Sequence, residues 1–463
     1  MYVKMQKLVY IKMQKFKHQY GALFLRHDCH PVNKLSNDTL QTMKRRDVIK
    51  SLALLPTVGS VLAKPSLTSA PVAGNNLRLT PQKTMPDLHR DAFVMDGHTH
   101  VMTRELLMKT DIGQRYADGN VDLPRAKEGG VDAMFFSVYT PEHYYPGRFE
   151  TKNTFRVVNL ALDQIKKNNA TIELALTASD IERINKNGKM AAFLDLEGGY
   201  DLEGDIDLLR ALYRLGLRSM QLTAHNTTNA FIDACNDISY WGGINDLGKK
   251  IIAEMNNLGM VINIAHASND AILQTVEASK HPVIYSHGGF YSIVNHPRCI
   301  SDEAAKAVAS RGGVIGIHFG SLFNNPKYWA WQKPAASSKR TVPKGTTPAS
   351  LVPRSATQTI EEVDNELKRE VPLNFRGTIP DEYWMHVDQL AKVIDYGVKL
   401  VGEDHMALGS DLDGGPELPH EIKDISDYPQ MTMAMQKLGY NDQRIKKILG
   451  LNWLRVIRQV TQG

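Results

Sequence analysis

The 463-residue chain is poor in cysteine. It contains only Cys29, Cys235 and Cys299, and no two of them are spaced as Cys-x-x-Cys. This excludes the disulfide framework of a small secreted domain and a structural metal site built from thiolates. One disulfide between Cys235 and Cys299 is compatible with the sequence but not implied by it. Any metal site is therefore expected to use imidazole and carboxylate ligands.

The chain also lacks a long apolar run and a strong charge excess over most of its length. Residues 52–62 form the apolar stretch near the N-terminus, which is too short to span a bilayer, so no stable membrane anchor is expected. The net charge of +5 arises in residues 1–63, with 11 Lys/Arg against 3 Asp/Glu, leaving 44 against 47 in the remainder. Nothing in that remainder favours nucleic-acid binding. No Gly-x-Gly-x-x-Gly follows an early strand, which argues against dinucleotide binding.

The basic N-terminal region resembles a twin-arginine export signal. Met43-Lys44-Arg45-Arg46 precedes the apolar stretch, and Val61-Leu62-Ala63 places small side chains where a signal peptidase cleaves. We therefore expect a signal peptide at 43–63, an extra segment at 1–42 that an over-extended start would explain, and a periplasmic or otherwise exported protein. The alternative is a basic tail with an amphipathic helix. Residues 64–90 are rich in Pro, Ser, Thr and Asn and are predicted to be a linker.

Residues 91–463 alternate short apolar strands with amphipathic helical stretches. The composition, 42% hydrophobic and 23% charged, is ordinary for a globular protein. Eight strands with intervening helices predict an α/β fold of the (β/α)8 TIM-barrel type rather than an open doubly wound sheet. The strands are expected near 93–95, 133–138, 191–196, 219–222, 260–264, 283–285, 314–317 and 407–409.

One segment interrupts this alternation. Residues 321–380, between the seventh and eighth predicted strands, contain Trp329-Ala330-Trp331 and then a stretch rich in Pro, Ser, Thr and Lys at 333–359. An insertion after a barrel strand emerges at the active-site face, where it could form a lid or a substrate wall. A disordered surface loop is the alternative for 333–359.

The stretch Asp96-Gly97-His98-Thr99-His100 closes the first apolar run. Side chains alternate along a strand, so His98 and His100 project in the same direction and can converge on one metal ion. Taken alone, two histidines one residue apart would more often lie on an ordinary surface strand.

Further metal-competent side chains follow other predicted strands at the same structural position. In a barrel, residues just after the strands point into one pocket at the C-terminal face. These residues are Glu197, His225, His266, His287 and Asp411, which follow the third, fourth, fifth, sixth and eighth predicted strands. The set as a whole indicates a metal-dependent active site, although each residue alone would be read as a hydrogen-bonded structural residue.

Five of these residues, His98, His100, Glu197, His266 and His287, suffice for two divalent ions that share one carboxylate. Imidazole and carboxylate ligands favour zinc, with manganese or cobalt as alternatives. Two metals a few ångström apart can activate a bridging water and polarise a carbonyl, which suits amide hydrolysis.

The ordered motifs resemble the membrane (renal) dipeptidase family, peptidase family M19, a group of amidohydrolase-type barrels. The likeness runs from about residue 90 to 460. The motifs are Asp96-Gly97-His98-Thr99-His100, Leu196-Glu197-Gly198-Gly199, Leu222-Thr223-Ala224-His225-Asn226, the segment 248–266, Ser286-His287, His296-Pro297-Arg298 with Ser301-Asp302-Glu303, and Gly409-Ser410-Asp411-Leu412-Asp413-Gly414.

The resemblance implies a role for each matching residue. His98 and His100 would bind one zinc, His266 and His287 the other, and Glu197 would bridge them. His225 would stabilise the oxyanion and Asp411 would handle the proton. Arg298 would hold the substrate's C-terminal carboxylate. Tyr139 resembles a position that contacts substrate, with an ordinary wall residue as the alternative. A planar guanidinium suits bidentate carboxylate recognition, although Arg298 could instead form an ordinary salt bridge. The resemblance also implies a homodimer.

The chain departs from the family pattern at several positions. His100 replaces the usual Asp, Asn263 and Ala265 replace Asp and Ser, and Cys299 replaces Asn. These changes keep the ligand set and bear on the groups that orient the ligands.

We expect a periplasmic zinc-dependent dipeptidase. The alternatives are hydrolysis of another amide, such as an N-acyl amino acid or a cyclic peptide, and a non-catalytic periplasmic binding protein on the same barrel.

Overall fold

The computed structural model describes residues 85–141, 145, 147, 149–224, 227–332, 358–370 and 379–461. The predicted signal peptide and the segment before it lie outside these residues, as do 333–357 and 371–378 of the predicted insertion. The end of the stretch predicted as linker forms a short helix, α2 (Asp87–Arg90).

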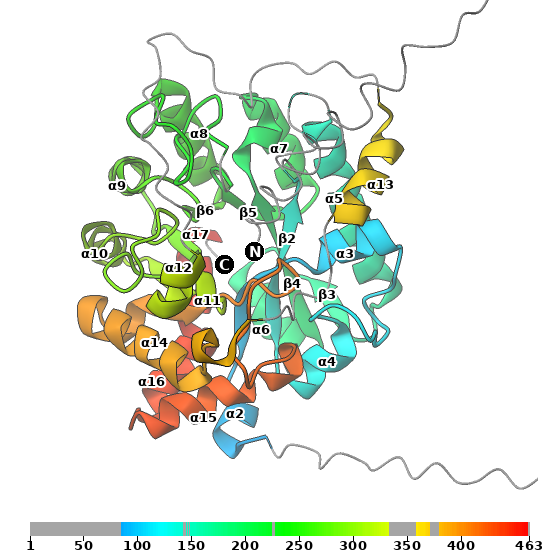
Figure 1. Ribbon diagram of the computed structural model, residues 1–463. Coiled ribbons are helices and arrows are strands. Elements are labelled where there is room, and N and C mark those ends of the chain that lie inside the picture. The colour runs from blue at the N-terminus through cyan, green and yellow to red at the C-terminus, as the bar shows by residue number, and fades with distance from the viewer. Residues whose placement is uncertain are drawn as a thin grey trace, which may run out of the picture. The chain divides into compact units, whose positions relative to one another are not determined.

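Eight parallel strands form a nearly closed barrel (Figure 1), in the order in which they were predicted. They are β1 (Met95–Thr99), β2 (Ala133–Tyr139), β4 (Met190–Glu197), β5 (Leu217–Gln221), β6 (Val261–Asn263), β7 (Ile284–Gly288), β8 (Val314–Ile317) and β9 (Met406–Leu408). An isolated bridge between Thr99 and Leu412 joins the segment after the last strand to the first strand. The (β/α)8 prediction is therefore confirmed.

One strand was not predicted. β3 (Ile172–Leu174) pairs with β4 outside the barrel path. It has three residues, of which only Ile172 is fully buried, so it carries too little alternation to be recognised in the sequence.

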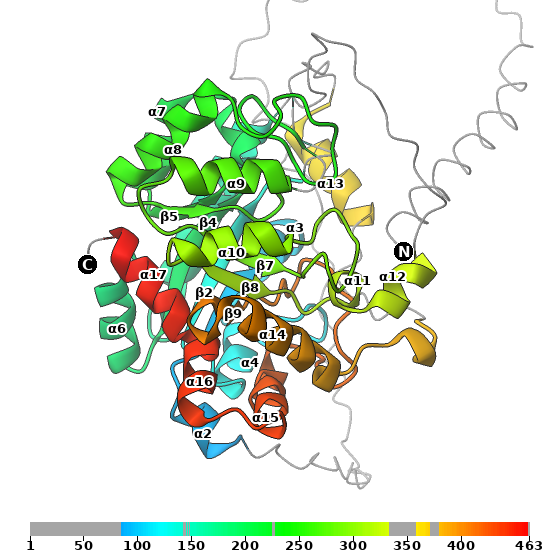
Figure 2. The same cartoon turned by 90° about the vertical axis from the view of Figure 1, so that its left-hand side faces the viewer.

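Helices surround the barrel (Figure 2), and several begin at a polar side chain that accepts a hydrogen bond from the first turn. The outer helices are α3 (Val101–Met108), α4 (Leu123–Glu128), α5 (Glu150–Lys167), α6 (Ala178–Lys186), α7 (Ile206–Arg214), α8 (Asp246–Leu258), α9 (Asn269–Ala278), α10 (Asp302–Ser310), α14 (Val387–Val401), α15 (Pro429–Lys437), α16 (Asp442–Lys446) and α17 (Asn452–Thr461). The larger core lies between this layer and the sheet.

The barrel interior changes from apolar to polar along the strands. On β4, every second residue faces inward, and the sequence of inward residues is Ala191, Phe193, Asp195, Glu197. Trp453 of α17 belongs to the apolar cluster of Ala191 and Phe193 and donates a hydrogen bond from Nε1 to the carbonyl oxygen of Leu408, at 3.0 Å. Apolar packing thus fills one end of the barrel, and the polar residues gather at the C-terminal ends of the strands.

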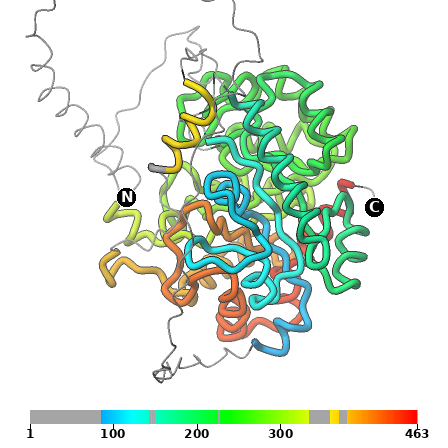
Figure 3. Tube along the Cα trace, turned by 90° about the vertical axis from the view of Figure 1, so that its right-hand side faces the viewer, coloured from blue at the N-terminus to red at the C-terminus, as the bar shows by residue number. Residues whose placement is uncertain are grey.

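The predicted insertion contains α11 (Ser321–Asn324), α12 (Pro326–Gln332) and α13 (Ile360–Glu370), and the 3-10 turn η3 (Asp381–Tyr383) follows it. Figure 3 shows α13 against the segment that holds α3, where Val363 and Leu367 bury Leu107. On α12, Trp329 donates to the carbonyl oxygen of Asn295 after β7, at 3.0 Å. The described parts of the insertion therefore pack at the C-terminal face of the barrel.

No helix among the described residues is both long and apolar enough to cross a membrane.

Candidate metal centre

The centre is built on one carboxylate at the end of β4. Glu197 is buried, and its Oε2 accepts a hydrogen bond from Ser137 of β2, at 2.9 Å. The same Oε2 lies 2.9 Å from Nε2 of His100 and 3.1 Å from Nε2 of His98. The Nε2 atoms of His98 and His100 are 3.1 Å apart. The His-x-His pair therefore converges on one oxygen of Glu197, as its spacing predicts.

The other oxygen of Glu197 faces a second pair of imidazoles. Oε1 lies 3.1 Å from Nε2 of His266, which is 3.1 Å from Nε2 of His287. His266 follows β6 in a left-handed conformation (φ +67°), which turns its ring back over the barrel. One carboxylate thus joins two imidazole pairs.

The chemistry of these five side chains fits two divalent cations. All five are at least 96% buried, and Glu197 Oε1 faces the imidazole of His266, at 3.1 Å. Within each pair the two Nε2 atoms face each other at 3.1 Å. Without a cation, they would bring together two lone pairs or two protons, or would share one proton. A cation between them would bind both lone pairs. Imidazole with carboxylate is a donor set that zinc binds readily.

The electrostatics of the pocket also favour positive charge. Burial lowers the pKa of both His98 and His100, but Glu197 beside them raises these pKa values to about 9 and about 10. Burial raises the pKa of the Glu197 carboxyl, yet His100 and His98 hold it well below its usual range. A metal ion would therefore compete with protons for this site.

Asp411 completes the pocket from the loop after β9. Its Oδ1 lies 3.2 Å from Nε2 of His100, and its Oδ2 lies 2.7 Å from Nε2 of His318. Its backbone is left-handed (φ +61°), and its N–H donates to the carbonyl oxygen of His98, at 3.0 Å. Burial raises the pKa of the Asp411 carboxyl, but His100 and His318 hold it well below its usual range.

Two of the predicted substrate-binding residues lie beside this cluster. Arg298 is 2% exposed and donates to the hydroxyl of Tyr285, at 2.7 Å, and to the carbonyl oxygen of His287, at 2.6 Å. The ring of Tyr139 lies edge-on to that of His100, with centroids 5.0 Å apart. The remaining predicted residue, His225, lies outside the described residues.

The sequence analysis missed His318. It directly follows β8, the one barrel strand to which no polar site residue was assigned. The signal that could have revealed it is the same one that identified Glu197 and His266, a polar side chain just after an apolar strand.

Asp195, which lies beside His98, was also not predicted from the sequence. Its Oδ2 is 3.8 Å from Nδ1 of His98, and it accepts hydrogen bonds from the amides of Gln221, at 2.9 Å, and Asn263, at 3.2 Å. Asn263 stands where the family usually has Asp. In this chain the carboxylate beside His98 comes instead from Asp195 on β4, two residues before Glu197.

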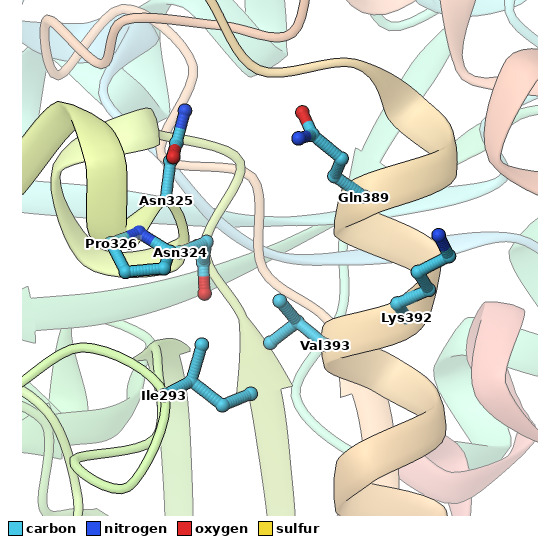
Figure 4. A pocket seen from close by; sticks show the side chains of 7 residues that line it. All are labelled: Ile293, Asn324, Asn325, Pro326, Gln389, Lys392 and Val393. Atoms are coloured by element: carbon cyan, nitrogen blue, oxygen red, sulfur yellow. The ribbon is translucent and has the colours of Figure 1, made fainter. Parts of the chain in front are cut away.

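A cavity of about 190 Å³ lies apart from this cluster, between α12 and α14. Figure 4 shows its lining, which is formed by Ile293, Asn324, Asn325, Pro326, Gln389, Lys392 and Val393. None of the predicted site residues lines it.

Comparison with known proteins identifies similar sequences. The family model described as membrane dipeptidase (peptidase family M19) matches residues 82–463. The chain is 28% identical over 350 residues to dipeptidase tcpJ of Claviceps purpurea, a match that covers 74% of this chain and 69% of that protein. It is 27% identical over 388 residues to dipeptidase 3 of Rattus norvegicus, covering 81% and 66%. The matches thus span about two thirds of each relative.

A solved structure has the same fold. The metallo peptidase from Rhodobacter sphaeroides, liganded with a phosphinate mimic of the dipeptide L-Ala-D-Ala, superposes with a TM-score of 0.63. The sequences are 18% identical, and the match covers 80% of this chain and all of the other.

Proposed function

The chain belongs to the membrane dipeptidase family, peptidase family M19, and on this basis we propose that it is a zinc-dependent dipeptidase with a binuclear site. The observation that carries the proposal is the position of Glu197, whose two oxygens each face a separate pair of buried imidazoles. This is the ligand arrangement expected for two ions that share one carboxylate.

In this proposal His98 and His100 hold one ion, His266 and His287 hold the other, and Glu197 belongs to both. Two divalent ions bound there would supply an acidified water and a polarised substrate carbonyl. The replacement of Asp by His at position 100 keeps a competent ligand and leaves the site one negative charge poorer.

Asp411 is the proposed proton carrier. Its Oδ1 faces the imidazole cluster, 3.2 Å from Nε2 of His100, and a carboxylate oxygen at this position can take a proton from the attacking water. The same oxygen then gives that proton to the leaving amine nitrogen. No covalent bond between enzyme and substrate is needed.

The proposed substrate is a dipeptide with a free C-terminal carboxylate. Arg298 would recognise the carboxylate, Tyr139 would line the pocket and His225 would stabilise the oxyanion. Arg298 lies beside His266, with Nη2 3.3 Å from Nε2, so a carboxylate held by Arg298 would lie close to the proposed metal site. The relatives of this chain carry the name dipeptidase, and the Rhodobacter enzyme holds a dipeptide mimic.

Export and dimerisation are also part of the proposal. Export is supported by Arg45-Arg46 ahead of the apolar stretch 52–62. A homodimer is supported by the family resemblance.

The test is release of amino acids by the purified protein from a panel of L,L- and L,D-dipeptides. We expect release from at least one dipeptide, and a strong loss in Arg298→Ala for substrates with a free carboxylate. Release only from amides without that carboxylate, unaffected by Arg298→Ala, would favour an N-acyl amino acid or cyclic peptide as substrate. A protein that binds two metals and releases nothing from either class would contradict a hydrolytic function.

A further inference from the structure

We propose that His318 is a positioning residue that holds the Asp411 carboxylate in the orientation needed for proton transfer. This inference rests on the proposed role of Asp411 and assigns a role to a residue that the family motifs did not indicate. Among the described contacts His318 makes no hydrogen bond to either pair of imidazoles. Its ring centroid lies 5.9 Å from that of His287, and its side-chain hydrogen bond within the cluster is to Asp411.

The hydrogen bonds of His318 fix which of its nitrogens carries the proton. Nδ1 lies 2.6 Å from the backbone N–H of Gly320, which can only donate. Nδ1 must therefore present its lone pair, and in the neutral ring the proton lies on Nε2. That Nε2–H donates to Oδ2 of Asp411, at 2.7 Å.

The surroundings keep the His318 ring in place. A Cβ at position 320 would lie 2.4 Å from Cε1 of His318, so only glycine allows the backbone N–H to approach so closely. Asn324 donates from Nδ2 to the carbonyl oxygens of His318 and Gly320, at 2.5 and 3.2 Å. The ring of Phe323 packs edge-on against the imidazole, with centroids 4.8 Å apart. His318 is 2% exposed.

Asp411 needs such a partner because a carboxylate turns easily about its last torsion. That torsion has a broad, roughly two-fold energy profile, so the two oxygens are not distinguished by the side chain itself. His318 occupies Oδ2 and leaves Oδ1 directed at the imidazole cluster. The left-handed backbone of Asp411 places the carboxylate close to Gly414, where a Cβ would lie 2.2 Å from Oδ1.

The proton balance of the step does not involve His318. The water oxygen forms a C–O bond to the substrate carbonyl carbon while its O–H bond breaks and an Oδ1–H bond forms on Asp411. The C–N bond then breaks, and the proton passes from Oδ1 to the leaving amine nitrogen. His318 keeps its Nε2 proton throughout and stabilises the negative charge on Asp411 before and after the cycle.

The first test compares two substitutions of His318. Gln places an amide donor near the position of Nε2, whereas Leu removes the donor and keeps the apolar bulk. We expect His318→Leu to lower kcat by about 10²-fold, the loss typical of a misplaced reacting group, with little change in KM or metal content. His318→Gln should restore most of that loss. His386→Leu, which alters a half-exposed imidazole elsewhere, is the matched control and should leave kcat unchanged.

A double-mutant cycle tests whether His318 acts through Asp411. In the Asp411→Asn background, His318→Leu should cause almost no further loss of kcat. Losses that multiply would overturn the proposal, as would equal losses in His318→Gln and His318→Leu.

A spectroscopic measurement keeps this proposal separate from the dipeptidase proposal. In ¹⁵N-histidine-labelled protein, the resonances that disappear in His318→Gln should report a neutral ring with the proton on Nε2. Asp411→Asn should shift them. A proton on Nδ1 would overturn the role of His318 even if dipeptides are cleaved. The expected tautomer together with no hydrolysis of any amide would refute the proposed function and, with it, proton transfer by Asp411.

Discussion

At the scale of single residues, the centre depends on groups that orient the ligands as much as on the ligands. A metal-binding histidine generally donates its second N–H to an acceptor, which fixes its ring. The Nδ1 of His98 faces Asp195 Oδ2 at 3.8 Å and the amide nitrogen of Gln221 at 3.4 Å. Only Asp195 can accept a proton there. Asp195 therefore has the position of an orienting carboxylate for His98.

This position leads to a prediction about metal affinity. Asp195→Asn removes the acceptor for His98 and should weaken binding of the ion at the His98 pair by about 10- to 100-fold. In the Asp195→Asn variant, the second substitution Asn263→Asp places a carboxylate on β6 next to position 195. This double variant should recover part of the metal affinity. Zinc titration against a chromophoric chelator measures both. Unchanged affinity in Asp195→Asn would contradict the role.

The raised pKa values of His98 and His100 predict how metal affinity depends on pH. Burial lowers these pKa values, but Glu197 raises them by more, to about 9 and about 10, so this pair of rings favours the protonated form in the cation-free protein. A metal ion must displace those protons. Affinity should therefore rise with pH between 6 and 9, by about tenfold per unit for each proton displaced, and fall in acid. A flat profile in chelator competition would show that the imidazoles are already neutral.

At the scale of elements, the strands place the ligands and the apolar end of the barrel supports the strands. Trp453 of α17 is fully buried, and a Cβ on Gly97 of β1 or Gly316 of β8 would lie 2.4 or 2.9 Å from its ring. Glycine at these positions lets the indole pack directly on strand backbone. One helix side chain thereby contacts the strands that carry His98 and His318.

Removing this side chain should destabilise the whole barrel. Trp453→Ala leaves a large cavity and should lower the free energy of unfolding by about 3–5 kcal/mol. Trp241→Ala is the control, because Trp241 is 38% exposed and its removal should cost less. Denaturant unfolding of the two variants measures the difference, and equal losses would contradict the role given to Trp453.

The elements also show which features the sequence could predict. Eight strands were recognised because each is an apolar run flanked by helical periodicity. The His-x-His spacing predicted that His98 and His100 lie together, although β1 ends at Thr99 and His100 is the N-cap residue of α3. β3 escaped recognition because it is short and only partly buried. His318 and Asp195 escaped because their roles depend on partners far away in the sequence, Asp411 and His98, whose contacts only the folded barrel creates.

At the scale of the whole molecule, a parallel barrel gathers residues spread over more than 300 positions at one end. His98 lies on β1 and Asp411 follows β9, and the Thr99–Leu412 bridge that closes the barrel brings them together. The left-handed backbones of His266 and Asp411 could not be predicted from side-chain patterns, because non-glycine residues adopt them only where surrounding contacts hold them. Both residues are in the pocket.

The central claim is that Glu197 joins two metal sites that perform hydrolysis. The measurement that tests it most directly is metal content by mass spectrometry, paired with dipeptide hydrolysis, before chelation, after chelation and after return of zinc. We expect two zinc ions per chain, loss of hydrolysis when the metal is removed, and recovery of both metal content and hydrolysis on zinc addition. Glu197→Gln should lower the content and the rate together. Full hydrolysis by the metal-free protein, or one ion per chain at full activity, would contradict it.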